Sequence, residues 1–286
     1  MKDNVYFIAD QHDFDQLMIR LAKVDYIGFD TEFVGERTYL PILCLLQVVH
    51  ERDIYLIDTL SVRNLKRFID IVSGDAVLKI THAGDNDYRL LYSLYQILPD
   101  RIFDIQIAAG FVGHNYPASF GRIVERELRY TLSKSHAVTN WEKRPLDPKA
   151  QQYAVEDVKY LPELYLRLRE KLVRLGRENW VWEEMEKWKN PDFYKIDAFK
   201  EATQNEFIYQ LKPREQLFLY RLYQWRRERA MHLNVPKENA LQNRHIANIV
   251  KTVKNGPGAF KNNRILQEYI WKPHLAEWLQ LWEAPP

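Results

Sequence analysis

Short apolar runs alternate with amphipathic stretches over the first 110 residues, and this alternation limits the folds that the chain can adopt. The runs have the length and β-branched content of strands: YIGFD, ILCLLQVV, DIYLID and AVLKIT. Other stretches space apolar residues three and four positions apart, as amphipathic helices do: DFDQLMIRLAKV, VRNLKRFIDIV and DYRLLYSLYQIL. We therefore predict an α/β domain, and the polar turn at residues 51–53 between two runs indicates a mixed sheet.

The last part of the chain has a different pattern. Residues 208–286 contain three amphipathic stretches, separated by NVPKEN and NGPGAF: PREQLFLYRLYQWRRERAMHL, NRHIANIVKTVKN and ILQEYIWKPHLAEWLQLW. A small all-α domain is predicted there, after an α/β domain at residues 1–172. Residues 173–207 are rich in tryptophan and lack the composition of a flexible linker, so they are expected to form a packed helical connector.

Charge also divides the chain. Residues 208–286 hold 13 Lys and Arg against six Glu, a net charge of +7, whereas the preceding residues hold 28 basic and 33 acidic side chains, a net charge of −5. A basic module joined to an acidic one is the pattern expected of a nucleic-acid-binding surface beside a site that collects metal cations.

Several classes of protein are disfavoured by the sequence. Apolar runs stay shorter than the roughly 18 residues that span a bilayer, and MKDNVYFIADQHDFDQ does not resemble a signal peptide, so a cytoplasmic protein without a membrane partner is expected. The single Cys44 lies in an apolar run and is interpreted as a core residue. Eight scattered His without nearby Cys argue against a zinc site.

Two carboxylates end the run YIGFDTEF. Asp30 and Glu32 are two positions apart in a predicted strand, so they share one face, about 6 to 7 Å apart. Like charges held this close need a partner.

Further acids lie in predicted helices. Asp85 and Asp87 stand at a helix start, where a carboxylate also serves as a cap, and capping is the preferred interpretation of Asp85. Tyr153 and Asp157 are four apart in a helix that begins at Pro148, so they share a face. Packing and surface exposure are the ordinary alternatives for this pair.

Together these residues could place four carboxylates at one end of the sheet. Carboxylate oxygens suit Mg²⁺ or Mn²⁺, and two such ions about 4 Å apart hydrolyse phosphodiesters. The Tyr153 phenol could orient the attacking water, although an ordinary pKa near 10 makes it a poor base.

Three stretches resemble, in order, the motifs of the ribonuclease D branch of the DEDD 3'-to-5' exonucleases: FDTEFVGERTYLPILCLLQV, THAGDNDYRLL and YAVEDVKYL. The third motif contains Tyr, as in one subgroup of that family. The similarity covers residues 5–170, including LSKSHAVTNWEKRPL. Residues 208–286 resemble the HRDC module of helicases and ribonuclease D through LFLYRLYQWRRERAMHLNVP.

The resemblance implies an RNase H-like mixed sheet and two divalent cations. It implies release of nucleoside 5'-monophosphates from a free RNA 3' end, with tRNA 3' ends as the substrate class. By position, Asp30, Glu32, Asp87 and Asp157 would be metal ligands, Asp30 would bridge both ions, and Tyr153 would contact the nucleophilic water. Better-known ribonuclease D proteins carry two HRDC modules, whereas this chain has room for one.

Basic and aromatic residues supply candidates for nucleic-acid binding, because Lys and Arg contact phosphates and aromatic rings stack on bases. The candidates, each with ordinary surface or core packing as the alternative, are Arg37, Lys134 and Arg144 in loop-like segments, Phe33 and Tyr39 for stacking, and Arg226, Arg227 and Arg229 in the C-terminal module. His82 is interpreted as a supporting or core residue.

Metal-dependent 3'-to-5' exoribonuclease activity is the predicted function. The alternatives are a related DNA exonuclease and a nucleic-acid-binding protein whose acidic cluster does not catalyse. The group that would read the RNA 2'-hydroxyl is not identified by the sequence.

Overall fold

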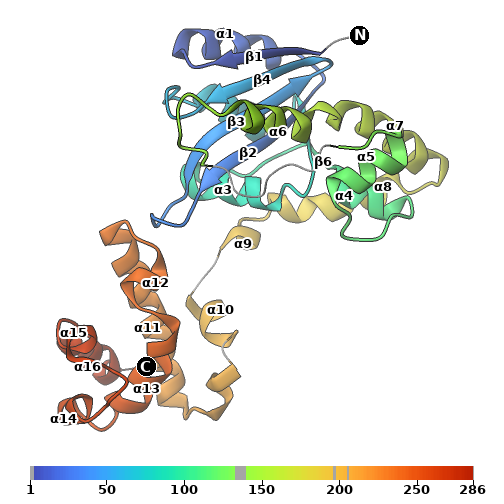
Figure 1. Cartoon of the computed structure of the whole chain (residues 1–286). Helices are drawn as coiled ribbons and strands as arrows, with labels where there is room; N and C mark the ends of the chain where they lie inside the picture. The colour runs from blue at the N-terminus through green and yellow to red at the C-terminus, as the bar shows by residue number, and fades with distance from the viewer. Residues whose placement is uncertain (1–2, 133–139, 196–197, 205, 286) are drawn as a thin grey trace. The chain divides into compact units, whose positions relative to one another are not determined.

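The computed structural model describes residues 3–132, 140–195, 198–204 and 206–285. The chain splits into two compact units (Figure 1). The first holds the chain up to Val34 and from Pro41 to Tyr194, and the second holds Gly35–Leu40 and the chain from Lys195. The expected connector at residues 173–207 is thus divided between the units, since Trp188 and Tyr194 belong to the core of the first one.

The first unit is built on a six-stranded sheet with the order β1-β4-β3-β2-β5-β6. The strands are β1 (Asn4–Ile8), β2 (Tyr26–Val34), β3 (Ile42–His50), β4 (Asp53–Asp58), β5 (Leu78–Thr81) and β6 (Ile102–Asp104). Strand β3 pairs antiparallel with β2 and β4, and the remaining neighbours pair in parallel. The predicted mixed sheet and the hairpin at residues 51–53 are confirmed. Strands β1 and β6, which are short, were not predicted from the alternation of apolar runs.

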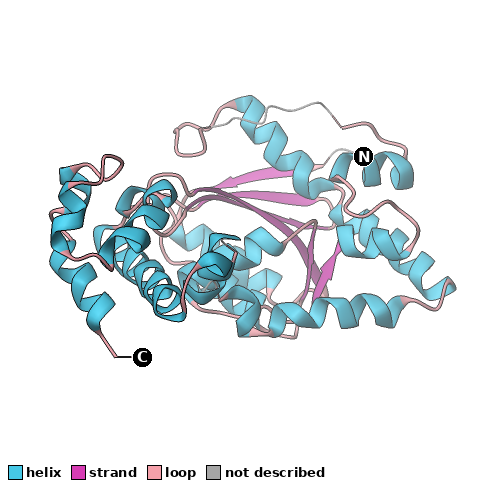
Figure 2. Cartoon of the chain, turned by 90° about the horizontal axis from the view of Figure 1, so that it is seen from below, coloured by secondary structure: helices cyan, strands magenta, loops and turns pink. Residues whose placement is uncertain are grey.

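Helices cover both faces of this sheet (Figures 1 and 2). The helices of this unit are α1 (Gln11–Leu21), α2 (Lys66–Ser73), α3 (Asp85–Tyr95), α4 (Ile105–Phe111), α5 (Phe120–Leu128), α6 (Pro148–Lys159), α7 (Leu161–Arg174), α8 (Glu178–Met185) and α9 (Pro191–Tyr194), with a 3-10 turn at Glu186–Lys189. Helix α6 packs on β2, β3 and β4, and α7 on β2, β3 and β5.

Successive side chains of β2 point alternately to the two layers of helices, one on each face of the sheet. Phe29 packs edge-on against Phe68 of α2 and Tyr88 of α3, so odd-numbered residues of β2 face that layer. Gly28 faces α7, where an added Cβ would lie 2.7 Å from Val49 Cγ1 and 3.0 Å from Leu161 Cβ. Glycine therefore permits the close approach of α7, and Asp30 and Glu32 share the face of Gly28.

The second unit contains helices joined by turns and loops, and no strand, in the part that the structure describes (Figure 2). Its elements are α10 (Ala198–Thr203), a 3-10 turn at Glu206–Gln210, α11 (Pro213–Leu233), α12 (Lys237–Ala240), α13 (Asn243–Val253), α14 (Pro257–Lys261), α15 (Glu268–Trp271) and α16 (Leu275–Glu283). Phe218, Leu222, Ile249, Phe260 and Trp278 lie in one buried core. The predicted all-α domain is confirmed.

None of the described helices combines the length and the apolar character needed to cross a bilayer.

Candidate active site

Three carboxylates meet at the junction of β2 and α6. Asp30, Glu32 and Asp157 each offer one carboxylate oxygen, and these oxygens lie within 4.8 Å of one another. Strand alternation directs Asp30 and Glu32 toward α6, and the β2–β3 register shifts after Glu32. All three residues are partly exposed, so an ion or substrate can reach them.

The local sequence fixes the start of α6 and thereby the placement of Asp157. Asp147 is the N-cap and accepts a hydrogen bond from Lys149 N, while Pro148 occupies the first turn. Tyr153 and Asp157 then follow one turn apart on the same face.

Asp87 approaches from the opposite layer. It lies in the first turn of α3, is 6% exposed, and accepts a hydrogen bond from the Thr31 hydroxyl. Its charge raises the pKa of Asp30 and Glu32, so it acts electrostatically on two of the three clustered acids without being one of the cluster. Because side chains alternate along β2, Thr31 faces away from Asp30 and Glu32 and toward Asp87 in α3. The sequence-based prediction did not include this role of Thr31, although strand alternation indicates the face on which it lies.

The acids are held in an environment that disfavours their charge. The pKa of Asp30 is raised well above its ordinary value. Burial is the largest cause, and the charges of Asp87, Asp157 and Glu32 add to it. Burial is also the main cause that raises the pKa of Glu32 to about 8 and those of Asp87 and Asp157 to about 7. A bound divalent cation would offset this repulsion.

The donor set fits such a cation. It consists of carboxylate oxygens, the ligands that Mg²⁺ and Mn²⁺ prefer. Asp157 Oδ2 is buried and has no hydrogen-bond partner among the described residues, so it has a lone pair available for a ligand. The cluster can therefore hold a metal ion.

Tyr153 stands beside this cluster. Its ring lies 6.0 Å from that of Trp141, and its hydroxyl lies close enough to Asp157 to lower the pKa of that acid against the effect of burial. Burial and the charges of Asp157 and Glu32 raise the Tyr153 pKa. The phenol therefore stays protonated and acts as a hydrogen-bond donor, not as a base.

Comparison with known proteins places the chain in a family. A family model described as 3'-5' exonuclease matches residues 5–173. Ribonuclease D of Sphingobium indicum is 35% identical over 244 residues, covering 85% of this chain and 63% of that protein. Ribonuclease D of Jannaschia sp. is 30% identical over 265 residues, covering 91% of this chain and 68% of that protein. This chain belongs to the ribonuclease D family of 3'-5' exonucleases.

A solved ribonuclease D structure agrees with this assignment. The Escherichia coli enzyme, described as an exoribonuclease involved in structured RNA processing, matches with a TM-score of 0.87 at 26% identity, over 98% of this chain and 74% of that one. The RNase H-like fold expected from the resemblance is confirmed. The chain spans about 60% of the length of the first curated ribonuclease D relatives.

Two residues near the ribonuclease D motifs have structural contacts. Asp85 does not cap α3, because the N-cap is Gly84 and the Asp85 carboxylate instead binds Arg89 Nε at 3.0 Å, one turn along the helix. His82 Nε2 lies 3.1 Å from the Ala118 carbonyl oxygen, and its ring packs against Phe120. This agrees with a supporting role for His82.

The Arg144 side chain forms hydrogen bonds within the first unit. Its Nη2 donates to Asp58 Oδ1 at 2.6 Å and to the Cys44 carbonyl at 2.7 Å, and its Nη1 donates to the Trp141 carbonyl at 2.7 Å. The guanidinium thus anchors the segment before α6 to β3 and β4. The geometry gives Arg144 this anchoring role, and the expected phosphate contact stays a prediction.

Arg226 is unavailable for the expected phosphate contact. It is 4% exposed, and its guanidinium binds Asn243 Oδ1 at 2.7 Å and Glu201 Oε2 at 3.1 Å. Arg227 and Arg229, on the same helix, are half-buried.

The other nucleic-acid candidates vary in exposure. Phe33 is partly buried and packs against the core, Arg37 is exposed, and Tyr39 is partly buried. Lys134 lies outside the described residues.

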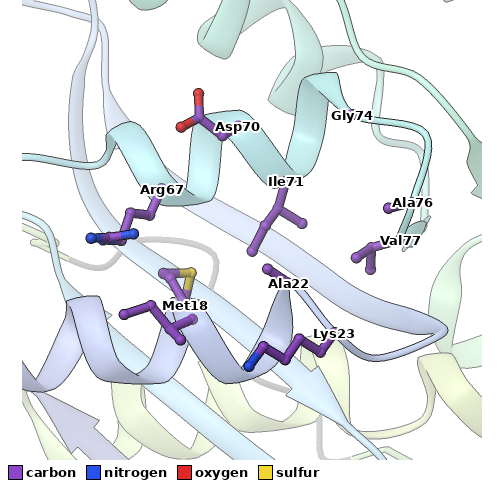
Figure 3. A pocket seen from close by; sticks show the side chains of 10 residues that line it. Met18, Ala22, Lys23, Arg67, Asp70, Ile71, Gly74, Ala76 and Val77 are labelled. Carbon is purple, nitrogen blue, oxygen red and sulfur yellow. The ribbon is translucent and has the colours of Figure 1, made fainter.

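A groove elsewhere on the first unit is separate from the acidic cluster (Figure 3). Helices α1 and α2 form its walls, and its lining includes Met18, Arg67, Ile71 and Val77. It contains none of the five candidate catalytic residues. The cluster at β2 and α6 is therefore the candidate active site.

We expect metal stabilisation of the protein to increase with pH. The pKa values of Glu32 and Asp157 in the folded state lie near 8 and 7. The metal-free folded state therefore binds more protons than the unfolded state above pH 4. Its stability falls as pH rises through 8. Metal binding requires ionised carboxylates. Thermal unfolding with and without Mg²⁺ should show a difference in midpoint that grows from pH 5 to pH 8. A difference that is constant with pH would contradict the assignment of these acids as ligands.

Proposed function

We propose that this chain is a metal-dependent 3'-to-5' exoribonuclease that acts in the cytoplasm and releases nucleoside 5'-monophosphates from a free RNA 3' end. The observation that carries the proposal is the convergence of Asp30, Glu32 and Asp157 within 4.8 Å, beside Tyr153. Family membership supports the class of reaction. The tRNA 3' end is the proposed substrate class.

The cluster would hold two Mg²⁺ or Mn²⁺ ions through Asp30, Glu32, Asp87 and Asp157. When bound, the ions lower the pKa of a coordinated water and stabilise the attacking and leaving oxygens. Asp30 would hold the ions together with Glu32 and Asp157, whose carboxylate oxygens lie within 4.8 Å of its own, and the charge of Asp87 acts on it from α3. The Thr31 hydroxyl keeps the Asp87 carboxylate in place.

Tyr153 would position the attacking water. Its raised pKa keeps the hydroxyl protonated, so it offers a hydrogen bond next to Asp157 without removing a proton itself. Packing against Trp141 restricts the ring to this position. The ordering of the water in line with the scissile bond is the catalytic contribution of this residue.

The proposed reaction is tested with matched RNA and DNA oligonucleotides whose 3' ends are free or blocked. We expect shortening of free-ended RNA in Mg²⁺ or Mn²⁺, release of nucleoside 5'-monophosphates, and no shortening with chelator or with a blocked 3' end. Faster digestion of DNA would favour the DNA exonuclease. Binding without cleavage under every metal condition would favour a non-catalytic nucleic-acid-binding protein.

The helical unit is proposed as an HRDC-like nucleic-acid-binding module. Its net charge of +7 over residues 208–286 supports contact with a polyanion. Because Arg226 is buried in ion pairs and Arg227 is half-exposed, Arg227 is the better phosphate contact of the two.

Arg227→Gln is expected to weaken RNA binding and to reduce the slope of log affinity against log salt by about 1. Binding would be measured across salt concentrations with chelator present, so that RNA stays intact. Lys66→Gln is the control, since Lys66 is paired with Asp70 on α2. An unchanged slope in Arg227→Gln would show that Arg227 does not contact RNA phosphates.

A further inference from the structure

Gln47 is a buried polar residue that the chain leaves without partners. It lies in the middle of β3, a strand of otherwise apolar residues between its two ends, and its exposed fraction is 0%. Neither its Nε2 nor its Oε1 has a hydrogen-bond partner among the residues that the structure describes. A leucine would fill this position without burying two polar atoms, so packing does not account for glutamine here.

The register places Gln47 next to the acidic cluster. Gln47 is the direct cross-strand partner of Asp30 in the antiparallel β2–β3 pair. Directly opposed residues project to the same face of a sheet, and their Cβ atoms lie about 5 Å apart. Helix α6, which carries Asp157, packs on this strand. The Gln47 carboxamide is therefore buried between the strand that carries Asp30 and the helix that carries Asp157.

The unpartnered atoms are complementary to the acids beside them. A glutamine amide supplies two N–H donors, whereas an ionised carboxylate only accepts. Asp157 Oδ2 is also buried and without a hydrogen-bond partner in the described part of the chain. No direct hydrogen bond joins Gln47 to Asp30 or Asp157 in the described part of the chain, so a buried water between the amide and the carboxylate of its cross-strand partner Asp30 would satisfy the amide.

We propose that Gln47 is a positioning residue, which holds the Asp30 carboxylate through a buried water in the orientation that binds metal. This inference rests on the metal site of the proposed function. Residues that hydrogen-bond metal-ligating carboxylates orient the ligands, and their loss typically lowers metal affinity 10- to 100-fold. In this role Gln47 acts on the ion only through Asp30.

The proposal is tested with Gln47→Leu and Mn²⁺ as the probe, in the full chain without RNA. The apparent Mn²⁺ affinity, taken from the metal dependence of the unfolding midpoint, is expected to fall about 10- to 100-fold. The metal-free midpoint is expected to stay equal or to rise, because the two polar atoms that are removed have no hydrogen-bond partner among the described residues. A purely structural role would give the opposite result, a lower metal-free midpoint with unchanged affinity.

Two further variants control the experiment. Leu45→Met changes an apolar residue of the same strand that is paired with Glu32, and it is expected to keep the wild-type Mn²⁺ affinity within about twofold. Gln47→Met replaces Gln47→Leu if leucine does not fit, because methionine adapts to irregular space.

The outcomes separate this inference from the proposed function. If the wild type binds Mn²⁺ and Asp30→Asn does not, the metal site stands, and wild-type affinity in Gln47→Leu overturns the role of Gln47 alone. A lowered metal-free midpoint in both Gln47 variants also overturns it. If the wild type shows no response to Mn²⁺, the proposed metal site and the role of Gln47 both fail.

Discussion

Replacing Asp30 with asparagine is expected to reduce the rate of RNA hydrolysis by about 10³-fold or more while leaving the fold intact. The substitution keeps the size of the side chain and removes the charge at the centre of the cluster. Metal ions contribute several kcal/mol of transition-state stabilisation, and each 1.36 kcal/mol is about tenfold in rate. Single-turnover rates at saturating enzyme measure the loss directly.

The same variant should be more stable than the wild type in the absence of metal. Asp30 is held next to Asp87, Asp157 and Glu32, and their charges raise its pKa beyond the effect of burial. Removing one of these charges relieves the repulsion, so the metal-free unfolding midpoint should rise. Loss of activity with a raised midpoint would show that the defect is in chemistry and not in folding.

Asp85→Asn is the matched control for Asp30→Asn. Asp85 is two residues from Asp87 in the second motif, but its carboxylate is paired with Arg89. We expect activity within a fewfold of wild type. A loss as large as that of Asp30→Asn would place Asp85 in the catalytic cluster and contradict the assignment made here.

Replacing Tyr153 with phenylalanine is expected to slow hydrolysis by about 10²-fold without weakening metal binding. The variant keeps the ring that packs on Trp141 and removes only the hydroxyl beside Asp157. The rate should fall at saturating RNA, since the hydroxyl acts on the attacking water, while the Mn²⁺ dependence of the unfolding midpoint stays as in the wild type.

Tyr92→Phe provides a control for the loss of a phenol in the same unit. Tyr92 stacks on Tyr194 at 4.8 Å and has no place in the cluster. Its variant should retain the wild-type rate. If Tyr153→Phe also retained that rate, the water-positioning role of Tyr153 would be wrong.

The parts of the site that follow local periodicity were predictable from sequence. Alternation in β2 put Asp30 and Glu32 on one face, and helical spacing in α6 put Tyr153 and Asp157 together. Both rules concern neighbours within one element, so they do not depend on how elements pack. The residue pattern could only suggest that β2 and α6 meet, because the residues concerned are more than 120 positions apart, and the family resemblance added support for that contact.

Long-range partners were the part that sequence reasoning could not supply. The charge of Arg144 and Arg226 does not distinguish them from surface arginines. Their side-chain contacts depend on Asp58 and Glu201, which lie 86 and 25 positions away. A buried acid at each place draws the guanidinium inward, since an unpaired buried charge is costly. The position of Gln47 also depends on a distant residue. It lies opposite Asp30 because of the β2–β3 register, which its own sequence neighbours do not determine.

The most direct test of the central claim compares wild type and Asp30→Asn on one end-labelled RNA with a free 3' end, in Mg²⁺ and in chelator. If the acidic cluster is the catalytic centre, the wild type in Mg²⁺ alone should shorten the RNA from that end to nucleoside 5'-monophosphates. Comparable shortening by Asp30→Asn, or by the wild type in chelator, would contradict a metal-dependent site at Asp30, Glu32 and Asp157.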